Sequence, residues 1–146
     1  MTLQVELVSP ERILYSGEAE SVLCRTVGGG DIAFYGGHSP FVGALDVGVV
    51  VVRTPEGAAD ETVAVHGGFV EVSSSAGSGD EGPATTVTIL SDVAELRSQI
   101  DVDRAQAAKD RAEAALRDGD DAEVRAALKR AEVRLSVAEA ATAVTH

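Results

Sequence analysis

The sequence predicts an α+β protein in which an N-terminal antiparallel β-sandwich is followed by a C-terminal antiparallel two-helix hairpin. Two observations carry this prediction. Up to about residue 95, short apolar stretches that alternate with polar residues are separated by turns containing Gly and Pro. From Asp101 onward the apolar spacing becomes helical, and Gly119 interrupts it once. We therefore expect two domains, residues 1–95 and residues 96–146.

The predicted strands are short and rich in β-branched residues, which suit a pleated surface. Leu3, Val5 and Leu7 alternate with polar residues, as in a strand with one buried face. Further strands are predicted around residues 22–24, 32–34, 48–53, 62–65, 69–72 and 86–90. The segments between them read as turns and loops: residues 36–40, 54–61, Gly67-Gly68 and the low-complexity stretch 73–83.

The two predicted helices have recognisable starts and apolar stripes. Asp101 is a candidate N-cap, because its short side chain can accept hydrogen bonds from the free N–H groups of a first turn. Asp120 and Glu123 have the spacing of a capping box for the second helix. The stripes are Ala105, Ala108, Ala112 and Ala115 on the first helix, and Val124, Leu128, Ala131, Leu135 and Ala138 on the second. Helices joined by so short a turn pack as antiparallel neighbours.

Composition excludes several classes of function. The chain has 146 residues and a formal net charge of −12, which argues against binding nucleic acid or an anionic membrane surface. No apolar stretch approaches the length of a membrane span, so we expect no direct membrane insertion. The single cysteine excludes an internal disulfide and fits a reducing compartment. The first residues lack the basic and long apolar regions of a secretory signal, so we expect none.

The residues that could support enzymatic chemistry do not form a pattern. Cys24 lies in a predicted strand, and no neighbouring motif pairs it with His38 as nucleophile and base. No His/Cys cluster has the spacing of metal ligands, and we expect no metal site. The glycines before Asp31 match neither a Walker loop nor a dinucleotide-binding fingerprint. The sequence therefore predicts a non-catalytic protein.

The arginines of the helical part are more informative. Nine of the twelve Lys and Arg residues lie in residues 95–146. Surface helices usually pair charges three or four residues apart, yet Arg111, Arg130 and Arg134 have no acidic residue at either spacing. Two interpretations are open: these arginines bind an anion or acidic surface from outside, or they are simply solvated.

Five groups of residues match one known family in order along the chain. They are SPER at 9–12 with LYSG at 14–17; DI at 31–32 with GHSP at 37–40; HGGFVEV at 66–72; IDVDRA at 100–105; and ALKRA at 127–131 with RLSVA at 134–138. On a layout of strands followed by a helical hairpin, these segments resemble the epsilon subunit of bacterial F-type ATP synthase over nearly the whole chain.

The resemblance implies a non-catalytic subunit of the central stalk in a proton-translocating complex. Its sandwich would bind the gamma subunit and rest on the ring of c subunits, and so couple ring rotation to the catalytic head. Its hairpin would extend into the alpha/beta head to inhibit ATP hydrolysis. The implied location is peripheral, at the cytoplasmic face of the bacterial plasma membrane. Asp31 and His38 would lie in the loop that such proteins present to the rotor base.

In some relatives the folded hairpin binds ATP, so the resemblance implies a regulatory ligand although no cofactor is required. The residues carried over for this site are Glu95, Asp101, Arg104, Ala105, Arg111, Arg130 and Arg134. Three of them are the arginines without helical partners. Gly36 and Ala33 depart from residues common in the family, which affects the expected ring contact.

Two rival functions remain open on the sequence. The first is a binding module whose main role is to sense ATP. The second is a generic adaptor that uses a coiled-coil-like hairpin to bind a partner. Both share the fold prediction and differ from the central-stalk function in their partners.

Overall fold

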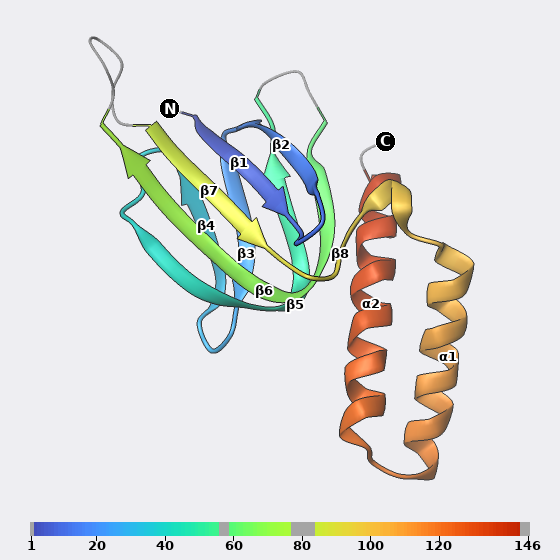
Figure 1. Ribbon diagram of the computed structural model, residues 1–146. Coiled ribbons are helices and arrows are strands. Elements are labelled where there is room, and N and C mark those ends of the chain that lie inside the picture. The colour runs from blue at the N-terminus through green and yellow to red at the C-terminus, as the bar shows by residue number, and fades with distance from the viewer. Residues whose placement is uncertain (1, 56–58, 77–83, 144–146) are drawn as a thin grey trace.

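The computed structural model describes residues 2–55, 59–76 and 84–143, the last four through their backbone. Its strands are β1 (Leu3–Val8), β2 (Ile13–Ala19), β3 (Ser21–Thr26), β4 (Gly30–Tyr35), β5 (Phe41–Arg53), β6 (Glu61–Ser75), β7 (Ala84–Leu90) and β8 (Ala94–Leu96). A 3-10 turn at Arg97–Gln99 leads to α1 (Val102–Asp118) and α2 (Ala122–Ala143). Figure 1 shows the strands folded into a sandwich and the two helices beside it, with α2 between α1 and the sheet. The predicted fold class is confirmed.

The strands form one continuous hydrogen-bonded path that folds over into two layers. Their order is β2-β1-β7-β6-β5-β3-β4, and β8 pairs with β6 outside this path. Among the described strands, β1 and β7 run parallel, while the other pairs are antiparallel. The β1–β7 pair is the one exception to the antiparallel pairing that the sequence predicted. The predicted domain boundary after residue 95 falls within β8.

Strand β6 is longer than predicted, because Gly67 and Gly68 bend it without ending it. Both glycines have positive φ, at 89° and 125°, a region that residues with a Cβ rarely adopt. Before the bend β6 pairs with β8, and after it β6 pairs with β7. A Cβ at Gly68 would lie 2.1 Å from the carbonyl oxygen of Leu90. The glycines therefore carry one strand from one layer to the other.

Three further strand predictions need correction. Strand β2 was not predicted, because only its last residue, Ala19, is fully buried and the apolar alternation is weak. Strand β5 begins at Phe41, not at Gly48. The prediction missed its first half because those residues are only partly buried and give a weak apolar pattern. Residues 73–75, predicted as loop, belong to β6; residues 77–83 of that predicted loop lie outside the described residues.

The core of the sandwich is aliphatic, as the composition predicted. Val5, Val22, Val70 and Val87 are completely buried, and Phe34 is the aromatic residue buried among them. Each such side chain contributes roughly 1.5–3 kcal/mol by leaving water. This cluster is formed by strand residues alone, so the sandwich completes its own core without the hairpin.

The helix starts follow the predicted chemistry with one shift. Asp101 is the N-cap of α1, and its Oδ1 accepts a hydrogen bond from the Arg104 N–H at 3.0 Å. At α2 the capping side chain is Asp121, which accepts from the N–H groups of Glu123 and Val124, so the capping role predicted for Asp120 was wrong. Asp120 instead forms an ion pair with Arg125 at 3.3 Å.

The helices meet through alanines, whose small side chains allow a close approach. Ala105 and Ala112 of α1 and Ala131 of α2 are buried, whereas Ala115 is exposed. Helix α2 also has a second buried face that the sequence patterns did not predict. There Val133 and Val137 pack on Ala64 of β6, with Val47, Val49 and Ile100 around them.

Candidate functional site at the junction of hairpin and sandwich

A hollow of about 350 Å³ lies where the start of α1, the segment before it and the middle of α2 converge. Its lining residues are Glu95, Gln99, Asp101, Arg104, Ala105, Ala108, Arg111 and Arg134. Six of the seven residues predicted for an ATP site are in this set. The seventh, Arg130, does not line the hollow.

The hollow is cationic on balance, with three guanidinium groups against two carboxylates. Arg104 and Arg111 lie about two turns apart on α1 and so share a face. Within the described parts of the chain, neither forms an ion pair. One carboxylate oxygen of Asp101, Oδ1, already accepts the capping hydrogen bond from the Arg104 N–H. This arrangement can bind an anionic ligand, because guanidinium groups form charge-assisted hydrogen bonds with phosphate oxygens.

Arg134 has a tertiary partner that the sequence could not reveal. Its Nε donates to Glu95 Oε1 at 2.6 Å, across 39 residues of sequence. The same oxygen accepts a hydrogen bond from His66 Nε2 at 3.0 Å. The interpretation that Arg134 lacks a partner was therefore wrong for the folded chain, since only spacings within one helix were considered.

His66 lies at the inner side of this cluster, with 4% of its side chain exposed. Burial lowers the pKa of His66; the hydrogen bond from His66 to Glu95 opposes this, while the charges of Arg134 and Arg130 add to it. The residue that faces His66 on the neighbouring strand β5 is Val47, and the His66 backbone N–H donates to the Val93 carbonyl oxygen at 3.0 Å. Neither Val47 nor Val93 adds a charge beside the imidazole. The imidazole is therefore neutral at pH 7, and its role was not predicted from sequence.

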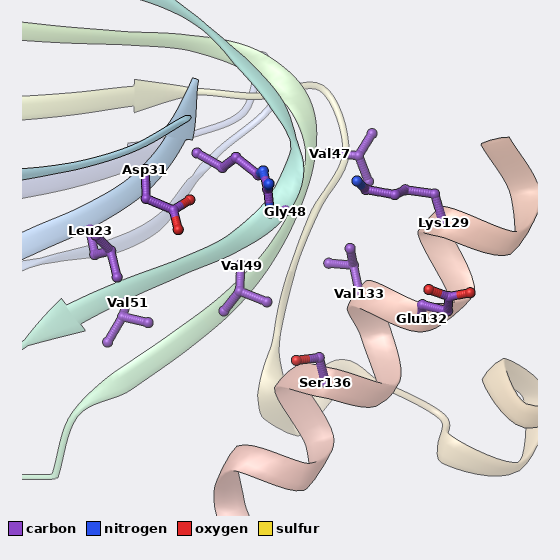
Figure 2. Close-up of a pocket in the computed structure, with 11 residues that line it drawn as sticks. Leu23, Asp31, Val47, Gly48, Val49, Val51, Lys129, Glu132, Val133 and Ser136 are labelled. Atoms are coloured by element: carbon purple, nitrogen blue, oxygen red, sulfur yellow. The ribbon is translucent and has the colours of Figure 1, made fainter. Parts of the chain in front are cut away.

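A second groove, of about 380 Å³, lies between α2 and the strands β3, β4 and β5 (Figure 2). Val47, Val49 and Val51 line its strand side, and Lys129, Glu132, Val133 and Ser136 line its helix side. Asp31 also lines this groove. The predicted placement of Asp31 in a loop was wrong, since it lies in β4 and pairs with Arg25 of β3.

His38 lies beyond the other end of β4, in the turn between β4 and β5. Its Nδ1 is 2.7 Å from the Ser39 carbonyl oxygen, and its ring contacts Phe34 edge-on with centroids 4.9 Å apart. Asp31 and His38 therefore do not share one loop. Their predicted contact with a rotor stays a prediction.

The possible nucleophile Cys24 is fully buried in the sandwich core. Burial raises the pKa of its thiol to about 12, so the thiolate is not formed near neutral pH.

Among the described residues, no group of three His, Cys, Asp or Glu side chains is arranged to hold a metal ion. No helix in the described part of the chain is long and apolar enough to cross a membrane.

Fold and site together define a two-part protein, in which a helical hairpin packs on a β-sandwich beside a cationic hollow. Residues 2–97 match the family described as "ATP synthase, Delta/Epsilon chain, beta-sandwich domain", and residues 98–139 match its "long alpha-helix domain". The chain belongs to this ATP synthase delta/epsilon family.

Relatives of known name cover both parts of the chain. The ATP synthase epsilon chain of Streptomyces griseus is 40% identical over 133 residues, which are 91% of this chain and 92% of that one. That of Thermobifida fusca is 42% identical over 139 residues, covering 94% and 93%. That of Alkalihalophilus pseudofirmus is 44% identical over 115 residues, covering 79% and 77%.

The fold is also found in a solved assembly. A chain in the mitochondrial ATP synthase of Euglena gracilis, described as OSCP, F1 and c-ring in rotational state 1, matches with a TM-score of 0.64. The match covers 99% of this chain and 82% of that chain at 23% sequence identity. At that identity the likeness establishes the shared fold.

Proposed function

We propose that this chain is the central-stalk epsilon subunit of a proton-translocating F-type ATP synthase. The observation that carries the proposal is about 40% identity to epsilon chains, over more than nine-tenths of both sequences, including sandwich and hairpin. In this role the sandwich binds the gamma subunit and the c-subunit ring and transmits ring rotation to the catalytic head. The subunit is peripheral, at the cytoplasmic face of the plasma membrane.

A non-catalytic role fits the side chains. The buried Cys24 thiol has a pKa too high for a nucleophile, and His38 already contacts a backbone carbonyl oxygen of its own turn. His66 is buried against Glu95 and Arg134, so it is not available as a general base to an incoming substrate. The charged groups of the junction are suited to binding and not to bond cleavage.

The hairpin is proposed to restrain ATP hydrolysis when it leaves the sandwich and enters the alpha/beta head. Support comes from the contacts that the described residues show between hairpin and sandwich: an apolar cluster around Ala64 and Val137, and the Glu95–Arg134 ion pair. The sandwich core does not include the hairpin, so the hairpin can detach without loss of that core.

Deleting residues 101–146 tests both halves of this proposal in the assembled complex. We expect ATP hydrolysis to rise, while the truncated chain still co-purifies with the gamma subunit and the c ring. Unchanged hydrolysis would argue against inhibition by the hairpin. Failure to co-purify with gamma and the c ring would argue against a sandwich that binds the rotor on its own, and would favour the adaptor function.

ATP is the proposed regulatory ligand of the hollow at the junction. The hollow's 350 Å³ lies within the usual range for small-molecule sites. Arg104, Arg111 and Arg134 supply donors for a polyphosphate, and Asp101 and Glu95 supply acceptors for an adenine amino group. A ligand that contacts both helices and Glu95 favours the docked, non-inhibitory hairpin, because it binds that state preferentially.

Titration of ATP into the isolated chain tests the site. We expect Arg104→Ala and Arg111→Ala to weaken binding about tenfold each, the equivalent of one charge-assisted hydrogen bond. Arg130→Ala should have a smaller effect, since Arg130 does not line the hollow. Arg125→Ala, which removes the ion pair with Asp120 near the α1–α2 turn, is the control. Equal binding by all variants, or none at millimolar ATP, would refute the site and leave the rotor function standing.

A further inference from the structure

The Glu95 carboxylate lies at the junction as a shared acceptor. One oxygen, Oε1, accepts hydrogen bonds from Nε of Arg134 at 2.6 Å and from Nε2 of His66 at 3.0 Å. His66 belongs to β6 of the sandwich, and Arg134 belongs to α2 of the hairpin. One carboxylate oxygen therefore connects the two parts of the molecule beside the hollow that Glu95 and Arg134 both line.

The proton on His66 is assigned by its partner. A carboxylate paired with a guanidinium can only accept hydrogen bonds, so the ring nitrogen facing Glu95 carries the hydrogen. Among the described residues, Nδ1 of His66 is buried without a hydrogen-bond partner. A second proton there would be an unsatisfied buried donor next to Arg134. The ring is thus held as a neutral donor to Glu95.

The bond to Glu95 leaves most of the Arg134 guanidinium available. Nε uses one of the five N–H donors, and four remain on the two terminal nitrogens. Because the guanidinium is planar and rigid, fixing Nε also fixes the direction of the other four donors. Arg134 lines the hollow, so its orientation decides how well these donors meet a ligand.

We propose that His66 is a positioning residue of the hollow: it anchors the Glu95 carboxylate, and Glu95 in turn orients the Arg134 guanidinium toward an anionic phosphate-bearing ligand. This role rests on the function proposed for the hollow, but His66 itself does not line it. In metal sites, residues that support a ligand orient it, and their loss typically weakens metal binding about tenfold or more; we expect a loss of the same order here.

A purely structural role for His66 would give a different result in a matched pair of variants. In His66→Gln, the terminal amide nitrogen reaches about as far as Nε2 and can still donate to Glu95. In His66→Asn, the amide is shorter by one carbon and reaches only the place of Nδ1. Both variants remove the ring from the same buried position, so loss of packing alone affects both. Only the bond to Glu95 distinguishes them.

The experiment compares the full chain with these two variants in two measurements. The first is the NMR signal of the Arg134 Nε–H, assigned with Arg134→Lys, and the second is ATP binding by calorimetry. We expect a slowly exchanging Nε–H signal in the unmodified chain and in His66→Gln, and its loss in His66→Asn. ATP binding should weaken about tenfold in His66→Asn and less than threefold in His66→Gln.

Two outcomes would overturn the proposal: an Arg134 signal and ATP affinity unchanged in His66→Asn, or equal losses in both variants. If the unmodified chain binds no ATP, the nucleotide function fails separately. The Arg134 signal still decides the positioning role in that case, because it is measured without ligand.

Discussion

The sandwich and the hairpin are stabilised in different ways. The sandwich has a continuous aliphatic core, to which its strands contribute fully buried side chains such as Val5 and Val87. Among the described residues, the hairpin packs on it through a separate apolar cluster around Ala64 and Val137 and through the carboxylate of Glu95. The difference teaches that the two parts can differ in local stability, since the sandwich core does not include the hairpin.

The largest expected effect is on the sandwich alone. Gly68→Ala places a Cβ 2.1 Å from the Leu90 carbonyl oxygen at a φ of 125°, and both the clash and the backbone strain act against folding. We expect unfolding in urea to show a loss of about 3 kcal/mol or more. Gly119→Ala is the control, because a Cβ at that position would meet nothing within 4 Å and the change should stay within about 0.5 kcal/mol. Similar losses in both would contradict the role of Gly68 in bending β6.

The next effect should separate the two regions. Val137→Ala removes two buried carbons from the contact between α2 and the sheet, which costs about 2 kcal/mol of docking free energy. Hydrogen exchange should show loss of protection in α2 and little change in β1 or β7. Val102→Ala is a matched control, since Val102 is about half exposed. An equal loss of protection in the sandwich would mean that the two regions unfold as one unit.

A smaller effect concerns the start of α1. Asp101→Ala removes the cap to the Arg104 N–H and should destabilise the first turn by about 1 kcal/mol. Asp101→Asn keeps an oxygen acceptor and should retain most of this stability. Asp103→Ala, which removes an acidic residue of the same turn without a capping bond, is the control. Exchange rates of the amides at residues 102–105 measure the effect; equal fraying in Asp101→Asn and Asp101→Ala would contradict a capping role.

The smallest and most reversible effect is expected from pH. With the hairpin docked, burial lowers the pKa of His66 of β6 below the ordinary histidine value of about 6.5, and the charges of Arg134 and Arg130 add to this. The undocked state therefore takes up the proton first as pH falls. Docking of the hairpin should not depend on pH above about 6.5. It should weaken as the pH falls from about 6.5 toward the pKa that His66 has in the docked state. Fluorescence transfer between labels on α1 and the sandwich would report the change.

The pH effect has a direct control in His66→Gln, which cannot take up the proton. Its docking should show no change across the same pH window. The other titratable and charged groups acting on His66 are Glu95 of β8 and Arg130 and Arg134 of α2. An identical pH profile in His66→Gln would assign the effect to another group and separate it from the cluster at Glu95.

Local chemistry made much of the fold predictable. The alternation in β1 and β7, the cap at Asp101 and the two helices depend on residues close in sequence, and the structure has them as expected. Where the local signal was weak, the prediction failed: β2 has few buried residues, and Gly67-Gly68 reads as a break although cross-strand pairing carries β6 through it. The residues predicted to bind ATP came from family motifs, and six of the seven line one hollow.

By itself the sequence determined the fold class, the family and the helix that carries Arg104 and Arg111, because period, capping and motif are properties of neighbouring residues. Only the tertiary structure decided the partners of Arg134 and the part played by His66. Glu95, whose carboxylate contacts both, lies 29 residues from His66 and 39 residues from Arg134 along the chain. Contacts at such separations follow from strand bending and helix docking, which no local pattern specifies. The contacts at the junction between sandwich and hairpin are therefore the part of this protein that only the tertiary structure could show.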